Sequence, residues 1–392
     1  MMARVDVIVI GGGVMGLAVT YYLARRGSRV VLLERDDIAS GTAGASDGVV
    51  SYHTKKPGEQ MQLAMRSIAM FEDLSRQLGE DMEFTPGCGG MLVAEDEMQW
   101  LMLEKISRQQ REGGADVRMI RTDEMRQLEP MLAKDLYGAL YTSTGAKIEP
   151  IRLTMALLHA AKRLGAVVLN DDEVVEVTLD ASGAFTGATT LSGQTFEANT
   201  AVLACGCWSD QAARMFGITL PVKPRRGQLL MTEPVGYFMH CTLQCARYNL
   251  IKYMPETITD AEILRLGAAL SIHQTPDGGI LIGGTREWVD FDRAATSDAM
   301  EAIAKRAIRF FPSLESVHIV RSFAGLRPYT PDGLPLIGPT KHVKGLYIAT
   351  GHEGDGIAMA PITGSLISEM ILDGRSSVQV EAFQPDRFDL KV

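Results

Sequence analysis

The sequence predicts an α/β fold in which a domain with a parallel sheet is interleaved with an α+β cap domain that has a mixed sheet. Two observations lead to this prediction. Residues 5–34 read as an apolar strand, a glycine turn, a helix rich in small residues and a second apolar strand, which is typical of a βαβ unit. The strands that would extend this sheet, near residue 166 and ending at Cys205, follow only after a long segment of different patterning. The chain must therefore leave the first domain and return to it.

The glycine turn of the first unit has a spacing that suits a dinucleotide. Gly11 permits the tight turn, Gly13 lets backbone N–H groups approach a pyrophosphate, and Gly16 lets the helix pack closely on the strand. The phosphates would then lie at the positive end of the helix. A bare GxGxxG motif is weak evidence, but here it is flanked by the strand, helix and second strand that the motif requires.

An acidic residue closes the second strand. Glu34 follows Gly16 by 18 positions, where a carboxylate can accept hydrogen bonds from both hydroxyls of an adenosine ribose. A 2′-phosphate would be repelled, so NADP is disfavoured. A glycine-rich turn in an ordinary parallel sheet would explain the glycines but not Glu34, and the motif by itself leaves NAD and FAD open.

Composition and charge exclude several classes of protein. The chain has 392 residues, 46% of them hydrophobic and 22% charged, with a formal net charge of −9, so we expect a folded chain whose main partner is neither nucleic acid nor an anionic membrane. The sequence has no unbroken apolar run that would span a bilayer and no signal-peptide pattern before its first strand. The five cysteines form no pair of CxxC clusters, which predicts no metal or iron–sulfur site and a reduced, cytoplasmic chain.

The remaining elements follow from periodicity and from turn residues. Apolar residues at helical spacing predict further helices at residues 59–79, 95–112, 150–164, 297–311 and 357–372. Apolar runs bounded by turn residues predict strands at 89–94, 166–170, 229–232, 268–273, 279–284 and 345–349, with several short strands between 173 and 205. From this order we assign residues 1–52, 146–224 and 321–392 to the parallel-sheet domain and residues 53–145 and 225–320 to the cap domain.

Four later segments carry a resemblance to a known family. They read AVLACGCWSD (201–210), PVKPRRGQLL (221–230), AGLRPYTPDGLPLIG (324–338) and GLYIATGHEGDGIAMAPITGSLI (345–367). Together with the amino-terminal glycine motif, and in the same order, they resemble the segments of the superfamily of D-amino-acid oxidase, glycine oxidase and sarcosine oxidase. The resemblance spans nearly the whole chain, and it implies a Rossmann-like FAD-binding domain interleaved with a mixed-sheet substrate-binding domain.

The resemblance implies that FAD is the cofactor. The small residues of GTAGASDGVVS (41–51) would lie against the pyrophosphate and isoalloxazine, and Glu173 and Val174 would offer backbone groups to adenine. The helix that begins near Gly356 would direct its positive end at the flavin pyrimidine ring. Phe323 to Gly325 include no cysteine where monomeric sarcosine oxidases carry their covalent link, so FAD is expected to be non-covalent. The expected cofactor-binding residues are Gly11, Gly13, Val14, Met15, Gly16, Glu34, Arg35, Ala45, Ser46, Asp47, Gly48, Val174, Cys205, Gly206, Trp208, Gly325, Gly351, Glu353, Gly354, Asp355, Gly356 and Ile357.

The resemblance also implies two catalytic residues, Arg327 and His352. In this superfamily the arginine of the GLRP segment typically binds the substrate carboxylate, and a guanidinium fork suits that planar group. A surface or structural arginine before a proline is the alternative. His352 lies in the loop expected near the flavin and need not be a base, because hydride transfer depends more on orientation. His273 and His53 are weaker candidates, and for His273 a core position is favoured over contact with a ligand.

The expected reaction is oxidation of the C–N bond of a small amino acid, or of an N-substituted one such as proline, hydroxyproline or sarcosine, to an imine by hydride transfer to FAD. DGVVSYHTKKPG (47–58) and GHEGDGI (351–357) look closest to the catalytic β subunits of proline, hydroxyproline and opine dehydrogenases. Those subunits work with other flavin and iron–sulfur subunits, so a second subunit of that kind is among the expected partners. Electrons would leave to oxygen, a quinone or that partner.

Two other functions stay open at this point. An NAD-linked dehydrogenase would use the same glycine motif, but it would leave the 41–51 loop and the GHEGDGI segment unexplained. A non-catalytic flavin or electron-relay subunit would keep the FAD segments and would not need Arg327.

Overall fold

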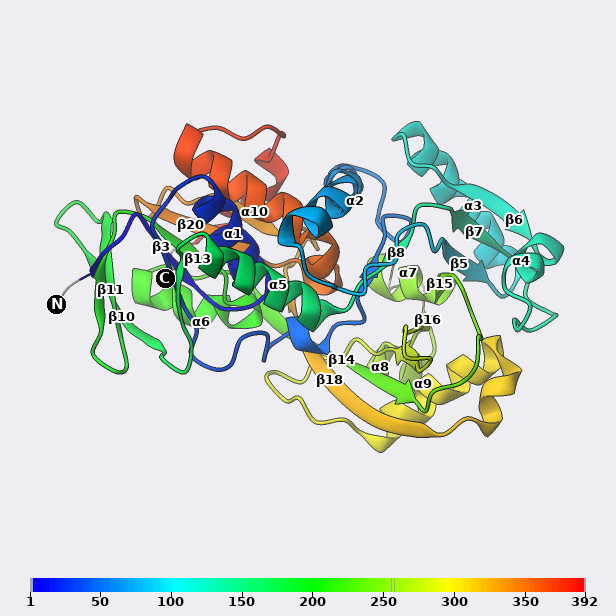
Figure 1. Cartoon of the computed structure of the whole chain (residues 1–392). Coiled ribbons are helices and arrows are strands. Elements are labelled where there is room, and N and C mark those ends of the chain that lie inside the picture. Colours follow the sequence, from blue (N-terminus) through cyan, green and yellow to red (C-terminus); the bar gives the residue numbers. More distant parts are fainter. Residues whose placement is uncertain (1–2, 255, 257, 391–392) are drawn as a thin grey trace.

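A six-stranded sheet forms the centre of one half of the fold, on the left of Figure 1. The computed structural model describes residues 3–254, 256 and 258–390. All neighbouring strands of this sheet are parallel except one pair at its edge, β19 (Leu336–Pro339) and β20 (Leu346–Thr350). The predicted strands near residue 166 and before Cys205 are confirmed as members of it. The spatial order is β19 (Leu336–Pro339), β20 (Leu346–Thr350), β13 (Ala201–Leu203), β2 (Val7–Ile10), β3 (Val30–Leu33) and β9 (Val167–Leu169).

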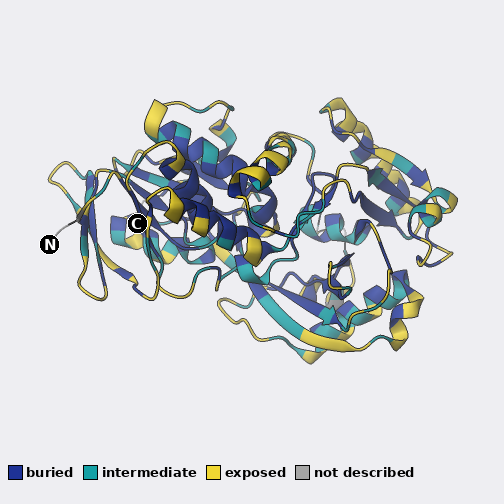
Figure 2. Cartoon of the chain, viewed as in Figure 1, coloured by how far each residue is buried: buried dark blue, intermediate teal, exposed yellow. Residues whose placement is uncertain are grey.

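Both faces of this sheet are covered, which is why its strands are apolar on both sides. Alternate side chains of β2 point into two different cores. One core contains residues of the helices α1 (Val14–Arg25), α2 (Glu59–Leu78), α5 (Pro150–Arg163) and α10 (Gly356–Asp373). The other is closed by a four-stranded sheet of order β1 (Ala3–Arg4), β12 (Thr195–Glu197), β11 (Phe185–Thr190) and β10 (Val174–Leu179). Figure 2 shows the buried strands between these layers.

Glycines let α1 pack closely on the turn that follows β2, and let α10 pack closely on α1. A Cβ at Gly16 would overlap the carbonyl oxygen of Gly11, and a Cβ at Gly364 of α10 would lie 2.8 Å from the backbone of Ala18 on α1. The packing role predicted for Gly16 is thereby confirmed. The close approach keeps the amino-terminal ends of α1 and α10 near the same edge of the sheet.

A second sheet, of mixed strand direction, forms the other half of the molecule. Side chains of its strand β5 (Gly90–Ala94) point alternately into two cores, one shared with α9 (Ser297–Phe310) and one with α3 (Glu97–Glu112). The spatial order is β18 (Ile319–Tyr329), β14 (Lys223–Thr232), β17 (Ile280–Gly283), β16 (Ser271–Gln274), β15 (Thr242–Cys245), β5 (Gly90–Ala94), β7 (Gly138–Thr142) and β6 (Arg118–Arg121). The other elements are β4 (Val49–Val50), paired with β8 (Ala146–Lys147), and the helices α4 (Thr122–Leu128), α6 (Ser209–Ala213), α7 (Ala246–Tyr253) and α8 (Ala261–Leu266).

The later helices predicted from periodicity are confirmed as α2, α3, α5, α9 and α10. Local capping explains where several of them begin and end. The Asp96 carboxylate accepts a hydrogen bond from the Gln99 backbone at the start of α3, and Glu149 does the same for Arg152 at the start of α5. Gly79 ends α2 in the left-handed conformation with φ of 70°.

The long antiparallel pair β14 and β18 is predicted only in part, as the last residues of β14. Prolines and glycines in both strands lower their strand propensity. In the observed register Gly227 lies opposite Gly325, and a proline of each strand faces a proline of the other. The residues that disfavour a strand are therefore matched across the pair.

The same pair connects the two halves of the molecule. Both strands belong to the mixed sheet, and Gly325 packs so closely on Ala45 that a Cβ would lie 2.8 Å from the Ala45 Cβ. We keep the division of the chain as a proposal: residues 1–52, 146–224 and 321–392 in one domain and 53–145 and 225–320 in the other, with β14 and β18 crossing between them.

Candidate functional site

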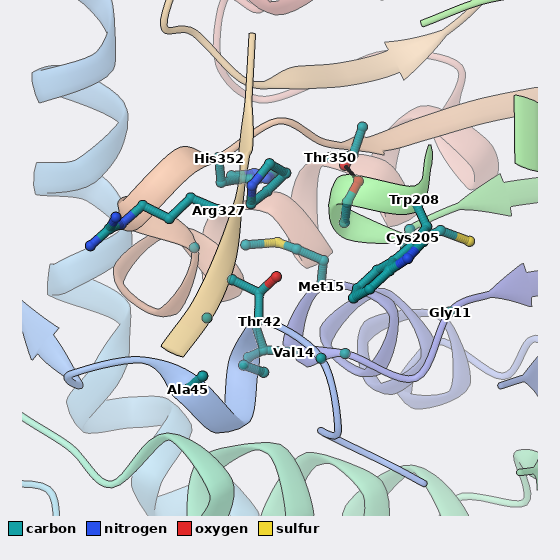
Figure 3. Close-up of a pocket in the computed structure, with 18 of the residues that line it drawn as sticks. Gly11, Val14, Met15, Thr42, Ala45, Cys205, Trp208, Arg327, Thr350 and His352 are labelled. Atoms are coloured by element: carbon teal, nitrogen blue, oxygen red, sulfur yellow. Dashed lines mark hydrogen bonds between the residues drawn. The ribbon is translucent and has the colours of Figure 1, made fainter. Parts of the chain in front are cut away.

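A cavity of about 500 Å³ lies between the two large sheets. Residues at the carboxyl ends of β2, β3, β13 and β20 line it from one side, and residues of β14, β16, β17 and β18 from the other. The carboxyl edge of a parallel sheet is the usual place of a ligand in α/β proteins. Figure 3 shows Gly11, Cys205 and Trp208 at one end of this cavity and Arg327 at the other.

The glycine turn and the start of α1 form a backbone-lined end of the cavity. Gly11 has φ of 113°, and a Cβ there would lie 2.6 Å from the Ala204 carbonyl oxygen. Gly13 has no neighbour within 4 Å of the position a Cβ would take, so its backbone faces open space. No side chain caps α1, and its first turn contains no acidic residue. Its first N–H groups are therefore available to a phosphate.

Glu34 lines the same end, just after β3. Its carboxylate accepts hydrogen bonds from the backbone N–H of Gly12 at 2.5 Å and of Asp36 at 2.9 Å. These two bonds fix the position of the carboxylate at the edge of the cavity. It keeps further lone pairs with which to accept ribose hydroxyls.

An aromatic group closes this end. Trp208 lines the cavity and stacks on Phe291, with ring centroids 5.8 Å apart, while the Arg35 guanidinium lies 4.7 Å from its ring centroid. Cys205 also lines the cavity, and burial raises the pKa of its thiol to about 12. The thiol is therefore protonated at neutral pH, which argues against a redox role for Cys205.

The start of α10 forms a second positive wall. Gly356 and Ile357 line the cavity, and the first turn of α10 has neither an acidic residue nor a side-chain cap. Asp355 occupies the capping position, but its carboxylate pairs with Lys55 and Lys252 instead. Two helices, α1 and α10, thus present free N–H groups to the cavity.

Arg327 lies at the opposite end, on β18. Gly227 on β14 makes room for it, because a Cβ at Gly227 would overlap its guanidinium. Arg327 Nη1 donates a hydrogen bond to the Thr285 carbonyl at 2.8 Å. Burial, and then the like charge of Arg286, lower the pKa of Arg327. An arginine stays charged at neutral pH, so this is a cation that an anionic ligand would stabilise.

Glu353 is the buried anion at this end. Its carboxylate pairs with Arg225 and lies 3.4 Å from Lys252 Nζ, 3.5 Å from Arg286 Nε and 3.9 Å from Arg327 Nε. Burial raises the pKa of Glu353, but the four cations, Arg225 foremost, outweigh it and hold the pKa well below its usual range. Glu353 also has φ of 51°, a conformation that non-glycine residues rarely adopt and that is often found at functional sites.

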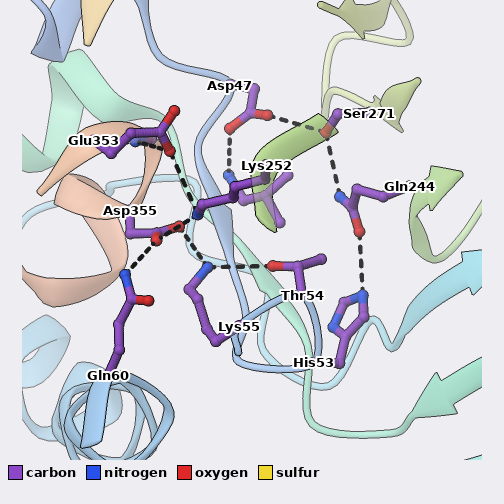
Figure 4. A network of polar contacts seen from close by, with 12 residues as sticks. Asp47, His53, Thr54, Lys55, Gln60, Gln244, Lys252, Ser271, Glu353 and Asp355 are labelled. Carbon is purple, nitrogen blue, oxygen red and sulfur yellow. Dashed lines mark hydrogen bonds and ion pairs between the residues drawn. The ribbon is translucent and has the colours of Figure 1, made fainter. Parts of the chain in front are cut away.

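A second carboxylate extends this network, as Figure 4 shows. Asp355 lies 2.6 Å from Lys55 Nζ and 2.8 Å from Lys252 Nζ, and it accepts a hydrogen bond from Gln60 Nε2 at 3.0 Å. Burial raises the pKa of Asp355, whereas Lys252 and Lys55 lower it, and the net shift is downward. Lys252 therefore connects the two buried carboxylates.

His352 lines the cavity between its two ends. Its Nε2 lies 3.0 Å from Thr363 Oγ1 on α10. Burial lowers the pKa of His352 to about 3, so the ring is neutral at physiological pH. Burial also lowers the pKa values of His53 and His273 to about 4. The core position favoured for His273 fits its burial on β16.

The structure brings most of the predicted site residues together. Four of them lie outside the cavity lining: Gly16 packs on the Gly11 carbonyl, Gly351 on the Thr330 side chain and Gly48 on the Ile148 carbonyl, and Asp355 belongs to the ion network. The predicted residues that line the cavity are Gly11, Gly13, Val14, Met15, Glu34, Arg35, Ala45, Ser46, Asp47, Val174, Cys205, Gly206, Trp208, Gly325, Arg327, His352, Glu353, Gly354, Gly356 and Ile357.

Four charged or aromatic residues at the Arg327 end are not predicted from the sequence: Arg225, Tyr248, Lys252 and Arg286. Tyr248 and Arg286 line the cavity, and Arg225 and Lys252 contact Glu353. A signal exists for Arg286, because Thr285-Arg286-Glu287 is a polar triplet directly after an apolar strand. Tyr248 and Lys252 lie on the short helix α7, which no periodicity marks.

The described residues include neither a cluster of metal ligands nor a membrane-spanning helix. They contain no group of three or more histidine, cysteine, aspartate or glutamate side chains that could hold a metal ion. None of their helices has both the length and the apolar character that crossing a membrane requires.

Comparison with known proteins gives matches over nearly the whole chain. A family model described as "FAD dependent oxidoreductase" and named DAO matches residues 6–370. The glycine oxidase of Geobacillus kaustophilus (strain HTA426) is 28% identical over 398 residues, which cover 99% of this chain and 98% of that protein. The bifunctional protein ThiO/ThiG of Trichormus variabilis is 30% identical, over 98% of this chain and 55% of that protein.

Two solved structures resemble this one closely. The crystal structure of glycine oxidase from Geobacillus kaustophilus has a TM-score of 0.88 at 27% identity and covers 99% of this chain and 100% of that one. The crystal structure of L-proline dehydrogenase from P. horikoshii has a TM-score of 0.87 at 24% identity, with 99% and 98% covered. The second likeness shows the fold alone, since the identity is low.

Proposed function

The chain belongs to the DAO family of FAD-dependent oxidoreductases, and from that premise we propose that it oxidises the C–N bond of a small amino acid to an imine. Secondary amines of the proline, hydroxyproline or sarcosine kind are the proposed substrates. The observation that carries the proposal is Arg327, a partly buried guanidinium that lines the cavity and has a lowered pKa. The full-length likeness to a glycine oxidase supports an amino-acid substrate.

The cavity lining fits FAD, which is the cofactor of this family. Gly11 has no room for a Cβ, Gly13 opens its backbone to the cavity, and Glu34 holds its carboxylate at the edge. These features suit a pyrophosphate and a ribose, and the free N–H groups of α10 suit an electron-rich ring edge. When bound, FAD supplies the acceptor for a hydride from the substrate Cα.

The residues of the chain would bind and orient the substrate. Arg327 would pair with the substrate carboxylate and so fix the Cα relative to the cofactor. His352 is neutral and held by Thr363, which suits a residue that shapes the site and does not take up a proton. Hydride loss from the Cα leaves the nitrogen lone pair to form the C=N bond. The product is hydrolysed by water, or stays cyclic when the nitrogen lies in a ring.

An anaerobic flavin-reduction screen tests the proposal. The purified protein is mixed with a panel of primary and secondary amino acids, and the visible absorption of the flavin is followed. We expect bleaching by at least one amino acid, and none by the corresponding amine without a carboxylate. Bleaching by no amino acid would contradict the proposal and would favour a relay subunit.

We also propose the route for electrons and the location of the protein. The resemblance of residues 47–58 and 351–357 to dehydrogenase β subunits supports transfer to a second flavin or iron–sulfur subunit. Oxygen and a quinone are the alternative acceptors. Co-purification of the protein from its natural host tests for the subunit. The described cysteines are all free, which supports a cytoplasmic location.

A further inference from the structure

Arg286 is a buried guanidinium that the proposed reaction does not yet use. It follows β17 and lines the cavity, and its side chain is 2% exposed. The guanidinium lies over the ring of Tyr248, 4.1 Å from the ring centroid. Among the described residues, its Nε and Nη2 have no hydrogen-bond partner. Glu353 lies 3.5 Å from Nε and offsets part of the charge, but it forms no hydrogen bond with these N–H groups. Buried donors without a hydrogen bond are costly, so they are available to an anionic ligand.

Arg286 and Arg327 lie side by side. Their Nε atoms are 3.5 Å and 3.9 Å from the same carboxylate oxygen of Glu353. Two guanidiniums this close repel each other, and one shared carboxylate that also pairs with Arg225 only partly offsets that repulsion. One end of the cavity therefore has two cationic side chains available to a ligand.

The charged side chains around Glu353 and Asp355 also carry more positive than negative charge. Within the described residues, this cluster contains the cations Lys55, Arg225, Lys252, Arg286 and Arg327, and the carboxylates Glu353 and Asp355. Asp47 is another acid on the cavity wall, and it accepts hydrogen bonds from Ser271 Oγ and the Val49 N–H. Even with Asp47 included, positive charge is in excess. A substrate with one carboxylate would leave part of that excess uncompensated.

We infer that this end of the cavity selects substrates with two carboxylates. Arg327 would bind the carboxylate next to the reacting carbon, and Arg286 the second one. The second carboxylate would lie on the amino-acid side chain or at the end of the nitrogen substituent. This inference rests on the proposed function and narrows it, because among N-substituted amino acids it favours those with a second carboxylate over proline, hydroxyproline and sarcosine, which have one.

Matched pairs of acids and amides test the inference. Iminodiacetate is compared with its monoamide, and aspartate with asparagine, in anaerobic reduction of the FAD-loaded protein. Each pair differs by one charge at nearly constant shape. We expect the diacid to reduce the flavin about 10- to 100-fold more efficiently than its amide, the value of one charge-assisted hydrogen-bonded contact. The pair with the larger ratio shows where the second carboxylate lies. Equal efficiency in both pairs would overturn the inference.

Variants at Arg286 assign the preference to this side chain. In Arg286→Gln the ratio of diacid to amide should fall to within about threefold of one, and Arg286→Lys should restore part of it. Arg265→Gln is the matched control, because Arg265 pairs with Asp298 on the surface and is 57% exposed. The bound-flavin spectrum reports whether each variant is folded. An unchanged ratio in Arg286→Gln would overturn the assignment.

A binding measurement separates this inference from the proposed function. The flavin spectrum is titrated with malonate and with its monoamide, neither of which is an amine. We expect malonate to bind about tenfold more tightly or better, and Arg286→Gln to abolish the difference. If no amino acid reduces the flavin but malonate shows this preference, the proposed function fails and the two-carboxylate site stands. If monocarboxylic amino acids reduce the flavin and malonate binds no more tightly than its monoamide, the proposed function stands and the two-carboxylate site fails.

Discussion

The two ends of the cavity are built in different ways. The Gly11 end uses backbone groups and the Glu34 carboxylate, all from one continuous segment that contains β2, the glycine turn, α1 and β3. The Arg327 end uses buried charged side chains from β14, β18, α7, the segment after β17 and the loop before α10. Backbone geometry can thus hold a cofactor with few side chains, whereas recognition of a particular substrate here depends on several charges that stabilise one another.

The largest expected effect comes from removing the anion of the charged end. Glu353→Gln leaves the cations Arg225, Lys252, Arg286 and Arg327 without their shared carboxylate. We expect the free energy of unfolding to fall by about 3–5 kcal/mol, measured by urea denaturation. The control is Glu301→Gln on α9, an exposed partner of Lys305, which should change stability by less than about 0.5 kcal/mol. Similar small losses in both variants would show that the charges are not coupled.

The second prediction separates the two ends by function. Arg327→Met should lower kcat/KM for carboxylate-bearing substrates about 30- to 1000-fold, because it removes a buried charge pair. The dissociation constant of FAD should stay within about threefold, since the groups that suit its pyrophosphate and ribose lie at the other end. Arg321→Met, on the exposed part of the same strand, is the control. A parallel loss for amines without a carboxylate would contradict the role of Arg327.

The third prediction concerns the backbone-built end. Gly11→Ala places a Cβ 2.6 Å from the Ala204 carbonyl oxygen at φ of 113°, and we expect a loss of about 1–3 kcal/mol in stability together with weaker FAD binding. Gly27→Ala is the matched control, with φ of 86° and open space around its Cβ position, and should cost about 1 kcal/mol. FAD affinity is measured by fluorescence titration. Equal effects at both glycines would mean that crowding at the turn is unimportant.

The smallest effect is a change in pH dependence. Burial lowers the pKa of His352 to about 3, so between that value and its ordinary pKa of about 6.5 the unfolded chain binds a proton that the folded one does not. Stability is therefore retained above about pH 6.5 and falls as the pH decreases. His352→Gln should reduce this slope by up to about 1.4 kcal/mol for each pH unit near pH 5. Chemical denaturation at several pH values measures it, and an unchanged slope would mean that His352 is already protonated in the fold.

The difference between the two ends also explains which parts of the fold and of the site can be predicted from the sequence. The glycine turn, Glu34 and the helices are predictable because each depends on residues near one another in the chain. Arg327 is found through its local GLRP segment. Arg286, Tyr248 and Lys252 are not, because their roles arise only when α7 and the end of β17 pack against the loop that carries Glu353. The strands β14 and β18 are largely missed because their prolines and glycines are tolerated only in pairs.

The shared position of Glu353 also has an evolutionary consequence. The Glu353 carboxylate offsets part of the positive charge of Arg225, Arg286 and Arg327. A replacement of Glu353 alone would therefore produce a poorly folded protein. Replacing any one of the arginines would change how much positive charge the Glu353 carboxylate offsets. We therefore expect these four positions to be inherited as a unit among descendants of this sequence, and to be exchanged together when a lineage acquires a new substrate.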